Sequence, residues 1–106
     1  MKTIKIFQID AFSDKLFGGN PAAICILDEW LDEKVMQAIG AENNLAETAF
    51  IVARQKDYEI RWFTPTVEVD LCGHATLAAA FVIFNMMNYN GKEILFHSNS
   101  TLTNLK

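Results

Sequence analysis

The feature that most constrains the fold is an apolar stretch, residues 74–87, in which almost every side chain is nonpolar. As a helix it would span roughly 20 Å, at about 1.5 Å per residue. A helix that is apolar on every side has to be surrounded on every side. We therefore expect Leu77, Ala80, Phe81 and Phe84 to be nearly fully buried, so that Leu77→Ala costs about 2–5 kcal/mol of stability.

Short apolar segments elsewhere in the chain have the pattern of strands that could surround this helix. The first of them is apolar on both faces, which predicts a strand buried on one side and half-covered on the other. The segments at residues 47–53 and 58–63 are separated by a polar turn and form a predicted hairpin. These observations favour an α+β fold, with a curved, barrel-like mixed sheet wrapped around a central apolar helix. The predicted strands are residues 2–11, 22–27, 47–53, 58–63, 94–96 and 101–105.

A second helix is predicted from Asp32, a suitable N-cap, to about Asn43. Its apolar residues Val35, Met36 and Ile39 form one stripe. Residues 13–20 end in Gly-Gly-Asn and are predicted to be a loop.

Length and charge narrow the classes of function. The chain has 106 residues, which fits a single domain over 1–106, and a net charge of −4 with two arginines and no basic run. Nucleic-acid binding is disfavoured because it requires clustered Lys and Arg. The apolar stretch is too short for a membrane span. With two cysteines and no apparent signal peptide, we expect a cytoplasmic protein.

The segment that enters the apolar helix, residues 70–76, is a candidate binding site. Gly73 would allow a ligand close to the backbone, and the free N–H groups of a helix start attract carboxylate or phosphate. His74 in the first turn could donate a hydrogen bond to a substrate oxygen. The alternative is an ordinary helix entry in which Asp70 or Thr76 occupies those N–H groups and His74 is structural.

Three further possibilities concern ionisable residues. Glu47 lies between apolar neighbours at a predicted strand start, which would suit an acid or base near neutral pH, although such glutamates are more often merely exposed. Cys72 could be a thiolate activated by the helix terminus, or a small buried loop thiol. A metal site from Cys72, His74 and Asp70 matches no familiar ligand spacing, so no metal is expected.

Four segments together resemble the phenazine-biosynthesis-like (PhzF-type) isomerase family. They occur in that family's order and near its spacing, and the resemblance extends over the chain from Lys2 to about Lys106. The four segments are residues 17–23 (FGGNPAA), 45–50 (LAETAF), 61–65 (RWFTP) and 70–78 (DLCGHATLA).

The resemblance implies a diaminopimelate-epimerase-like fold of two similar halves, of which this chain matches the N-terminal one. It implies cofactor-independent isomerisation, which in the type enzyme moves a hydrogen on a dihydro-hydroxyanthranilate ring. Glu47 would be the acid and base, and Gly73, His74, Ala75 and Asn20 would hold a small anionic metabolite. In related epimerases a cysteine at the position of Cys72 is one of two bases, which keeps a cysteine-based epimerase open as an alternative.

Two departures from the family pattern bear on activity. Ala46 stands where the family usually has a serine, and family members are more than twice as long as this chain. The second half would supply a further acid and would cover an apolar face. We therefore expect weak or no turnover from this chain alone. We also expect a homodimer, or otherwise a complex with a separate C-terminal half. A non-catalytic half-domain that binds an anionic metabolite or a partner chain is the third hypothesis.

Overall fold

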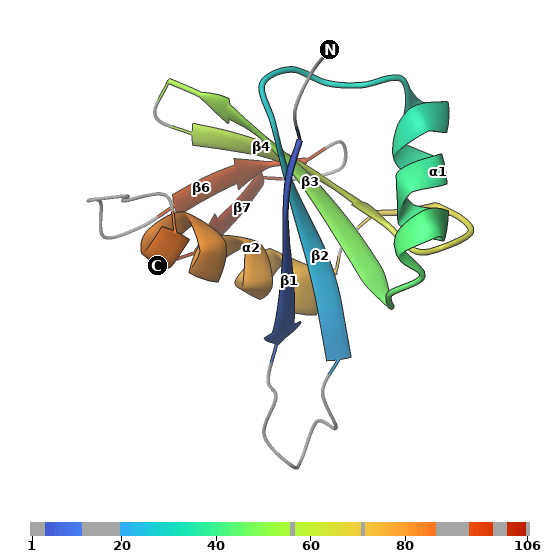
Figure 1. The fold of residues 1–106 in the computed structure, drawn as a ribbon. Coiled ribbons are helices and arrows are strands. Elements are labelled where there is room, and N and C mark those ends of the chain that lie inside the picture. The colour runs from blue at the N-terminus through green and yellow to red at the C-terminus, as the bar shows by residue number, and fades with distance from the viewer. Residues whose placement is uncertain are drawn as a thin grey trace.

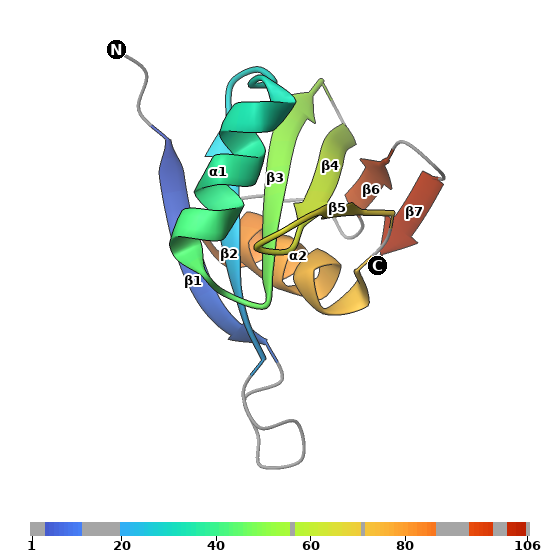
Figure 2. The ribbon, with the colours of Figure 1, turned by 90° about the vertical axis from the view of Figure 1, so that its right-hand side faces the viewer.

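The fold is one mixed sheet with a helix on each face (Figures 1 and 2). The computed structural model describes residues 4–11, 20–55, 57–70, 72–86, 94–98 and 102–105. The strands run in the spatial order β1-β2-β3-β4-β6-β7, and the short β5 pairs with β4. The elements are β1 (Lys5–Ala11), β2 (Asn20–Leu27), α1 (Glu33–Asn43), β3 (Glu47–Arg54), β4 (Asp57–Phe63), β5 (Glu68–Val69), α2 (Gly73–Met86), β6 (Ile94–His97) and β7 (Leu102–Leu105).

The placement of the two helices follows from the strand directions. Strands β2 and β3 are parallel and joined through α1, while β4 and β6 are parallel and joined through α2. Because β3 and β4 are antiparallel, the second pair runs in the opposite direction to the first. Both connections step the same way across the sheet, and right-handed crossovers then place their helices on opposite faces.

Strand alternation divides the interior into two cores. In β3, Ala49 and Ile51 face α2, whereas Phe50 and Val52 face α1. The core on the α2 side also contains Trp62 and the inner face of α2. The core on the α1 side is smaller and includes Met36, Cys25 and an edge-to-face pair of Phe50 and Phe63, whose ring centroids are 5.4 Å apart.

Helix α1 begins and ends as the sequence predicts. The Asp32 side chain accepts a hydrogen bond from the Lys34 amide at 3.0 Å, which caps the helix. Asn44 in the left-handed conformation terminates it. The predicted apolar stripe is only partly buried: Met36 is enclosed, but Val35 is 46% exposed.

Most predicted strands are present within two or three residues of their expected bounds. In β1, Phe7 and Ile9 pack on the α2 side but are only partly buried, and Ile6 on the other face is exposed, so the strand is less covered than the sequence predicts. The two-residue strand β5 was not predicted, since Glu68–Val69 is too short to show a periodicity. The predicted loop at 13–20 lies almost wholly outside the described residues.

The prediction that α2 is buried on every side was wrong. Leu77 and Phe81 are 44% and 47% exposed, Phe84 is only partly buried, and of the four residues named only Ala80 is buried. The sheet curves along one side of α2 and does not close around it, so the helix keeps an apolar outer stripe of Leu77 and Phe81. Its small residues Ala75 and Ala79 face the sheet, where they allow close packing.

Candidate functional site

Glu47 is aimed at the α2 side of the sheet by the alternation of β3. Residues two apart on a strand point to the same face, and Ala49 and Ile51 belong to the core beneath α2. Glu47 is the first residue of β3 and lies opposite Ala22 of the parallel strand β2. The carboxylate is half-buried at the end of the sheet where α2 begins.

Helix α2 begins with Cys72 as its N-terminal cap. The Cys72 carbonyl accepts from the Thr76 amide at 3.0 Å and from the Thr76 hydroxyl at 2.7 Å. Thr76 is buried, and its hydroxyl oxygen accepts from the indole Nε1 of Trp62 at 2.9 Å. The first turn of the helix is thereby tied to strand β4.

The Cys72 thiol lies near the start of this helix and near Glu47. Burial is the main cause that raises the pKa of the thiol to about 11. The negative charge of Glu47 acts in the same direction, and the helix amides act against it.

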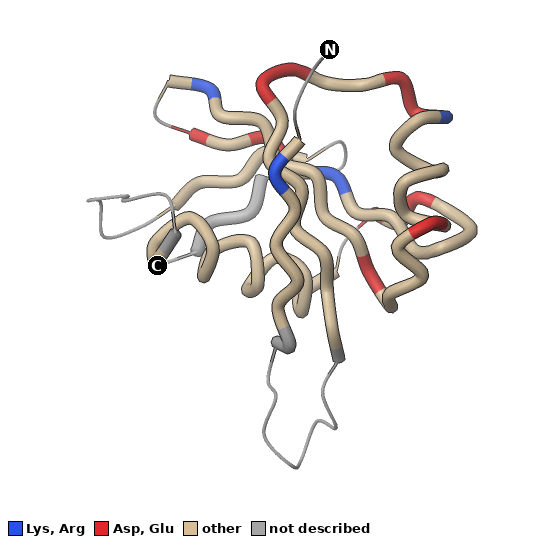
Figure 3. Tube along the Cα trace, in the orientation of Figure 1, with Lys and Arg blue, Asp and Glu red and all other residues tan. Residues whose placement is uncertain are grey.

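A small pocket opens at this junction, lined by Pro21, Ala22, Ala46, Glu47 and His74. The structure thus brings Glu47 and His74 to one pocket, as the sequence predicts. Ala46 lies at its rim without a hydroxyl that could contact a ligand. Helix α2, which begins here, carries no Lys, Arg, Asp or Glu side chain (Figure 3), so its N-terminal amides leave a partial positive charge at the pocket.

The other predicted binding residues differ in what they can offer. Ala75 is buried in the core beneath α2, so only its backbone could reach a ligand. Asn20 begins β2 next to Pro21, but its side chain lies outside the described part of the chain. Gly73 is exposed, and a Cβ added there would meet nothing within 4 Å. The fold therefore does not require a glycine at position 73. A ligand that closely approaches the helix start would require one, because a Cβ would occupy the space next to the backbone.

We expect Gly73→Ala to separate stability from binding. The variant should be as stable as the wild type or up to about 1 kcal/mol more stable, because alanine favours the helix and meets no neighbour. Its affinity for anthranilate, a small aromatic carboxylate, should fall about ten-fold, as when one hydrogen bond to a charged group is lost. Denaturant unfolding and amide NMR titration measure the two effects.

Gly40 offers the matched control for this substitution. A Cβ at Gly40 would lie 3.3 Å from the Thr64 carbonyl oxygen and 3.4 Å from the Phe63 Cβ, so Gly40→Ala should be less stable than Gly73→Ala and bind the probe normally. Unchanged binding by Gly73→Ala would contradict an anion site at this helix start.

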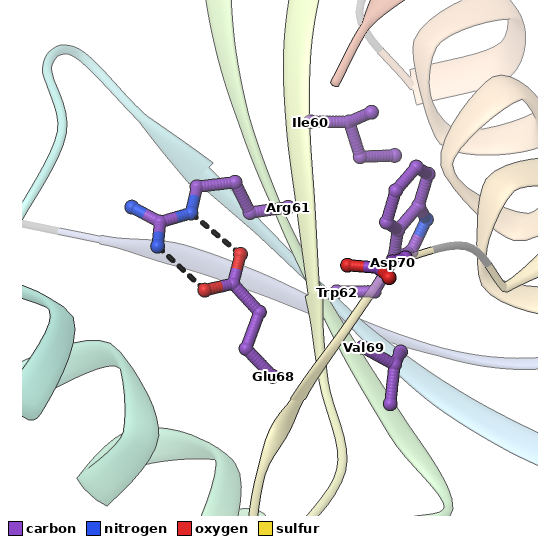
Figure 4. A pocket seen from close by; sticks show the side chains of 6 residues that line it. All are labelled: Ile60, Arg61, Trp62, Glu68, Val69 and Asp70. Atoms are coloured by element: carbon purple, nitrogen blue, oxygen red, sulfur yellow. Dashed lines mark hydrogen bonds and ion pairs between the residues drawn. The ribbon is translucent and has the colours of Figure 1, made fainter. Parts of the chain in front are cut away.

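A second pocket lies on β4 and β5 and is structural in character (Figure 4). Arg61 makes two hydrogen bonds to the Glu68 carboxylate, at 2.7 and 2.6 Å, and a further one to Glu33 of α1. Its guanidinium also lies 5.7 Å from the ring centroids of Trp30 and Phe63. The hydrogen bonds with Glu68 are the main cause that holds the pKa of Arg61 above its usual range, and Glu33 acts in the same direction. Arg61 on β4 thus holds β5 and α1 in place through its ion pairs with Glu68 and Glu33.

The described residues also bear on two other classes of function. No group of three or more His, Cys, Asp or Glu there is arranged to hold a metal ion. No helix among them is long and apolar enough to cross a membrane.

The fold and the pocket define a class of protein: an α+β unit in which a strand-end glutamate meets the N-terminus of an apolar central helix. The family profile described as "Phenazine biosynthesis-like protein" (PhzC-PhzF) matches residues 9–105. The chain belongs to this family.

Individual relatives agree with that assignment. The chain is 62% identical over 85 residues to the "Uncharacterized isomerase PA2770" of Pseudomonas aeruginosa, a match that covers 80% of this chain and 33% of that protein. A crystal structure of a PhzF family protein from Enterococcus faecalis superposes with a TM-score of 0.88 at 50% identity, covering 95% of this chain and 39% of that one. The chain thus spans between a third and two fifths of the length of these proteins.

One more distant structure supports the fold alone. The predicted epimerase PA4716 of Pseudomonas aeruginosa superposes with a TM-score of 0.83 at 24% identity, covering 96% of this chain and 37% of that one. The α+β class expected from the sequence is confirmed, with the difference that the sheet stays open.

Sequence reasoning missed the residues that support the site. It considered Thr76 as a possible partner of the free helix amides, but the Thr76 side chain bonds a carbonyl and an indole instead. It treated Cys72 as a base or a plain loop thiol, whereas the Cys72 carbonyl accepts the hydrogen bonds from Thr76 with which the helix begins. The position of Cys72 directly before Gly73 was the available signal, because the residue before a helix supplies the carbonyl for the first intrahelical bond.

Proposed function

We propose that this chain forms the glutamate-bearing half of a PhzF-type isomerase, which moves a proton on a small carboxylate-bearing metabolite without a cofactor. Glu47 accepts and returns the proton, and the start of α2 at Gly73 and His74 binds the substrate anion. Ala75 contributes backbone to the same turn, and Asn20 directly precedes Pro21, which lines the pocket.

The observation that carries this proposal is the convergence of Glu47 and His74 on one pocket at the N-terminus of an uncharged helix. A base and an anion anchor have to reach the same small molecule, and the pocket is formed by the residues that would do so. The relatives' designation as isomerases agrees with proton transfer as the reaction class.

The alternative of a cysteine-based epimerase has less support. With a thiol pKa of about 11, only about one Cys72 in ten thousand is a thiolate at pH 7. The nearby negative charge of Glu47 opposes ionisation of the thiol further and so acts to raise its pKa. A general base needs a substantial deprotonated fraction at working pH, which favours Glu47 over Cys72.

An activity assay tests the proposal. The 106-residue chain is assayed alone, and as a chimera joined to the remaining part of the 62%-identical Pseudomonas protein, with dihydro-hydroxyanthranilate as the probe. Deuterium uptake into the probe from D₂O reports proton transfer. We expect turnover by the chimera and weak or no turnover by the chain alone. Proton transfer that persists in a chimera carrying Glu47→Gln would contradict the proposed role of Glu47.

We further propose that the 106-residue chain associates as a homodimer through the outer stripe of α2. Leu77 and Phe81 lie one helical turn apart and are both nearly half exposed, which is unfavourable for two large apolar side chains. The net charge of −4 would oppose association elsewhere, but α2 carries no charge, so two copies can meet there without like-charge repulsion.

Light scattering at micromolar concentration should give twice the monomer mass of 11.9 kDa. Leu77→Lys should shift the mass to the monomer because it buries a charge in the contact. Val35→Lys is the matched control, since Val35 is equally exposed on α1, at 46%, and should leave the dimer intact. A monodisperse wild-type monomer would overturn the dimer and favour a separate C-terminal half as the partner.

A further inference from the structure

We propose that Trp62 is a positioning residue for the candidate site: through the buried hydroxyl of Thr76, its indole fixes the first turn of α2 relative to the strand that carries Glu47. The inference rests on the proposed function, in which that turn binds the substrate anion and Glu47 moves the proton. Neither Trp62 nor Thr76 lines the pocket, so both act through the helix start.

The first support is a chain of three hydrogen bonds with a fixed direction. The indole Nε1 of Trp62 donates to the Thr76 hydroxyl oxygen at 2.9 Å. The hydroxyl donates to the Cys72 carbonyl at 2.7 Å, and the Thr76 amide donates to the same carbonyl at 3.0 Å. Because an indole N–H can only donate, the single hydroxyl hydrogen is left for the carbonyl. Trp62 and Thr76 are 1% and 2% exposed, so water does not compete for these groups.

The second support is the place of Trp62 in the sheet. It lies directly opposite Ala49 of β3 and opposite Val69 of β5, so its backbone is held by a strand on each side. Trp62 and Ala49 both belong to the core beneath α2. Glu47 is two residues before Ala49 on β3 and points to the same face. The indole is therefore anchored beside the strand end that carries the carboxylate, and one sheet holds both parts of the site.

The third support is what the indole adds to the packing of the helix. A threonine hydroxyl bonded to the carbonyl four residues earlier is a local feature and does not set where the helix lies. The small residues Ala75 and Ala79 pack on the sheet through contacts that have no preferred direction. The indole hydrogen bond is directional and joins residues 14 apart in the sequence. It thus specifies one position of the helix start, and with it the position of the amides of Gly73 and His74.

The first experiment follows the two indole N–H signals of the ¹⁵N-labelled 106-residue chain during titration with anthranilate. Trp30 is the internal reference, because its indole donates to Glu59 at 2.6 Å and the residue packs on the α1 side. The Trp62 signal should shift with the same midpoint as the amides of Gly73 and His74, while the Trp30 signal stays in place. A Trp62 signal that does not respond while those amides do would overturn the proposal.

Matched tryptophan substitutions separate positioning from stability. Trp62→Phe removes the indole donor but keeps the Thr76 hydroxyl that bonds Cys72, and Trp30→Phe is the same change on the other face of the sheet. The affinity of the folded chain for anthranilate should fall about five-fold in Trp62→Phe and stay unchanged in Trp30→Phe. Amide spectra establish that each variant is folded. Affinities equal to that of the wild type in both variants would identify the Trp62 hydrogen bond as structural and overturn the proposal.

Thr76→Val and Thr76→Ser form a second pair that does not depend on replacing a large core side chain. Valine has nearly the shape of threonine but lacks the hydroxyl, whereas serine keeps it. In the chimera, Thr76→Val should lower kcat about ten-fold because the anchor is displaced, and Thr76→Ser should keep most of kcat. A Thr76→Val chimera that is less stable but has the wild-type kcat would also overturn the positioning role.

Failure of this inference and failure of the proposed function give different results. If anthranilate leaves the Gly73 and His74 amides of the wild-type chain unchanged and the chimera has no turnover, the anion anchor is refuted, and the positioning role with it. If binding and turnover stay at wild-type levels in Trp62→Phe and Thr76→Val, the positioning role alone is refuted.

Discussion

Glu47→Gln is expected to lower kcat of the chimera by a factor on the order of 10²–10⁴, which is the contribution typical of a positioned acid or base. Glutamine has nearly the shape of glutamate but cannot take up a proton. The loss should therefore appear in kcat rather than in folding, because Glu47 is half-buried at a strand end and belongs to neither core. Deuterium uptake into the dihydro-hydroxyanthranilate probe measures it.

The control for this prediction is Glu42→Gln. Glu42 is an exposed carboxylate near the end of α1, only five residues from Glu47 in the sequence, and its substitution should leave kcat within about two-fold. If Glu47→Gln retained the full rate, the proposed role of Glu47 would be wrong and the base would have to be sought elsewhere.

The second large effect concerns the two faces of α2. Ile83→Ala is expected to cost about 2–5 kcal/mol of unfolding free energy, because Ile83 is completely buried between α2 and the sheet and its loss leaves a cavity. Leu77→Ala, in the same helix, should cost less than about 1 kcal/mol because the side chain is 44% exposed. Both changes introduce alanine into the helix interior, so helix propensity does not explain the difference.

Urea denaturation at two protein concentrations measures both effects. If the homodimer forms through the outer stripe, the cost of Leu77→Ala should grow with protein concentration while that of Ile83→Ala stays constant. Equal costs for the two substitutions at low concentration would mean that the outer stripe is covered within a single chain, contrary to the exposure of Leu77 and Phe81.

The sequence by itself determined the elements and the family. Capping at Asp32, the two-residue alternation in residues 47–53 and the apolar stretch beginning at His74 each follow from local chemistry, and the structure has α1, β3 and α2 at those places. The order of the four family segments is also a property of the sequence alone, and it pointed to Glu47, Gly73 and His74.

Only the tertiary structure decided which face of α2 is covered. A helix that is apolar all round has no periodicity from which a buried side can be read. The sheet packs on the side with Ala75 and Ala79, where small side chains let the backbones approach, and leaves Leu77 and Phe81 outside. The strand alternation places Glu47 on a face, but the path of the chain through β4 and β5 brings His74 to the same pocket from 27 residues further along the chain. Contacts between distant residues depend on the path of the whole chain, so the hydrogen bond from Trp62 to Thr76 at the start of α2 was beyond the reach of local patterns.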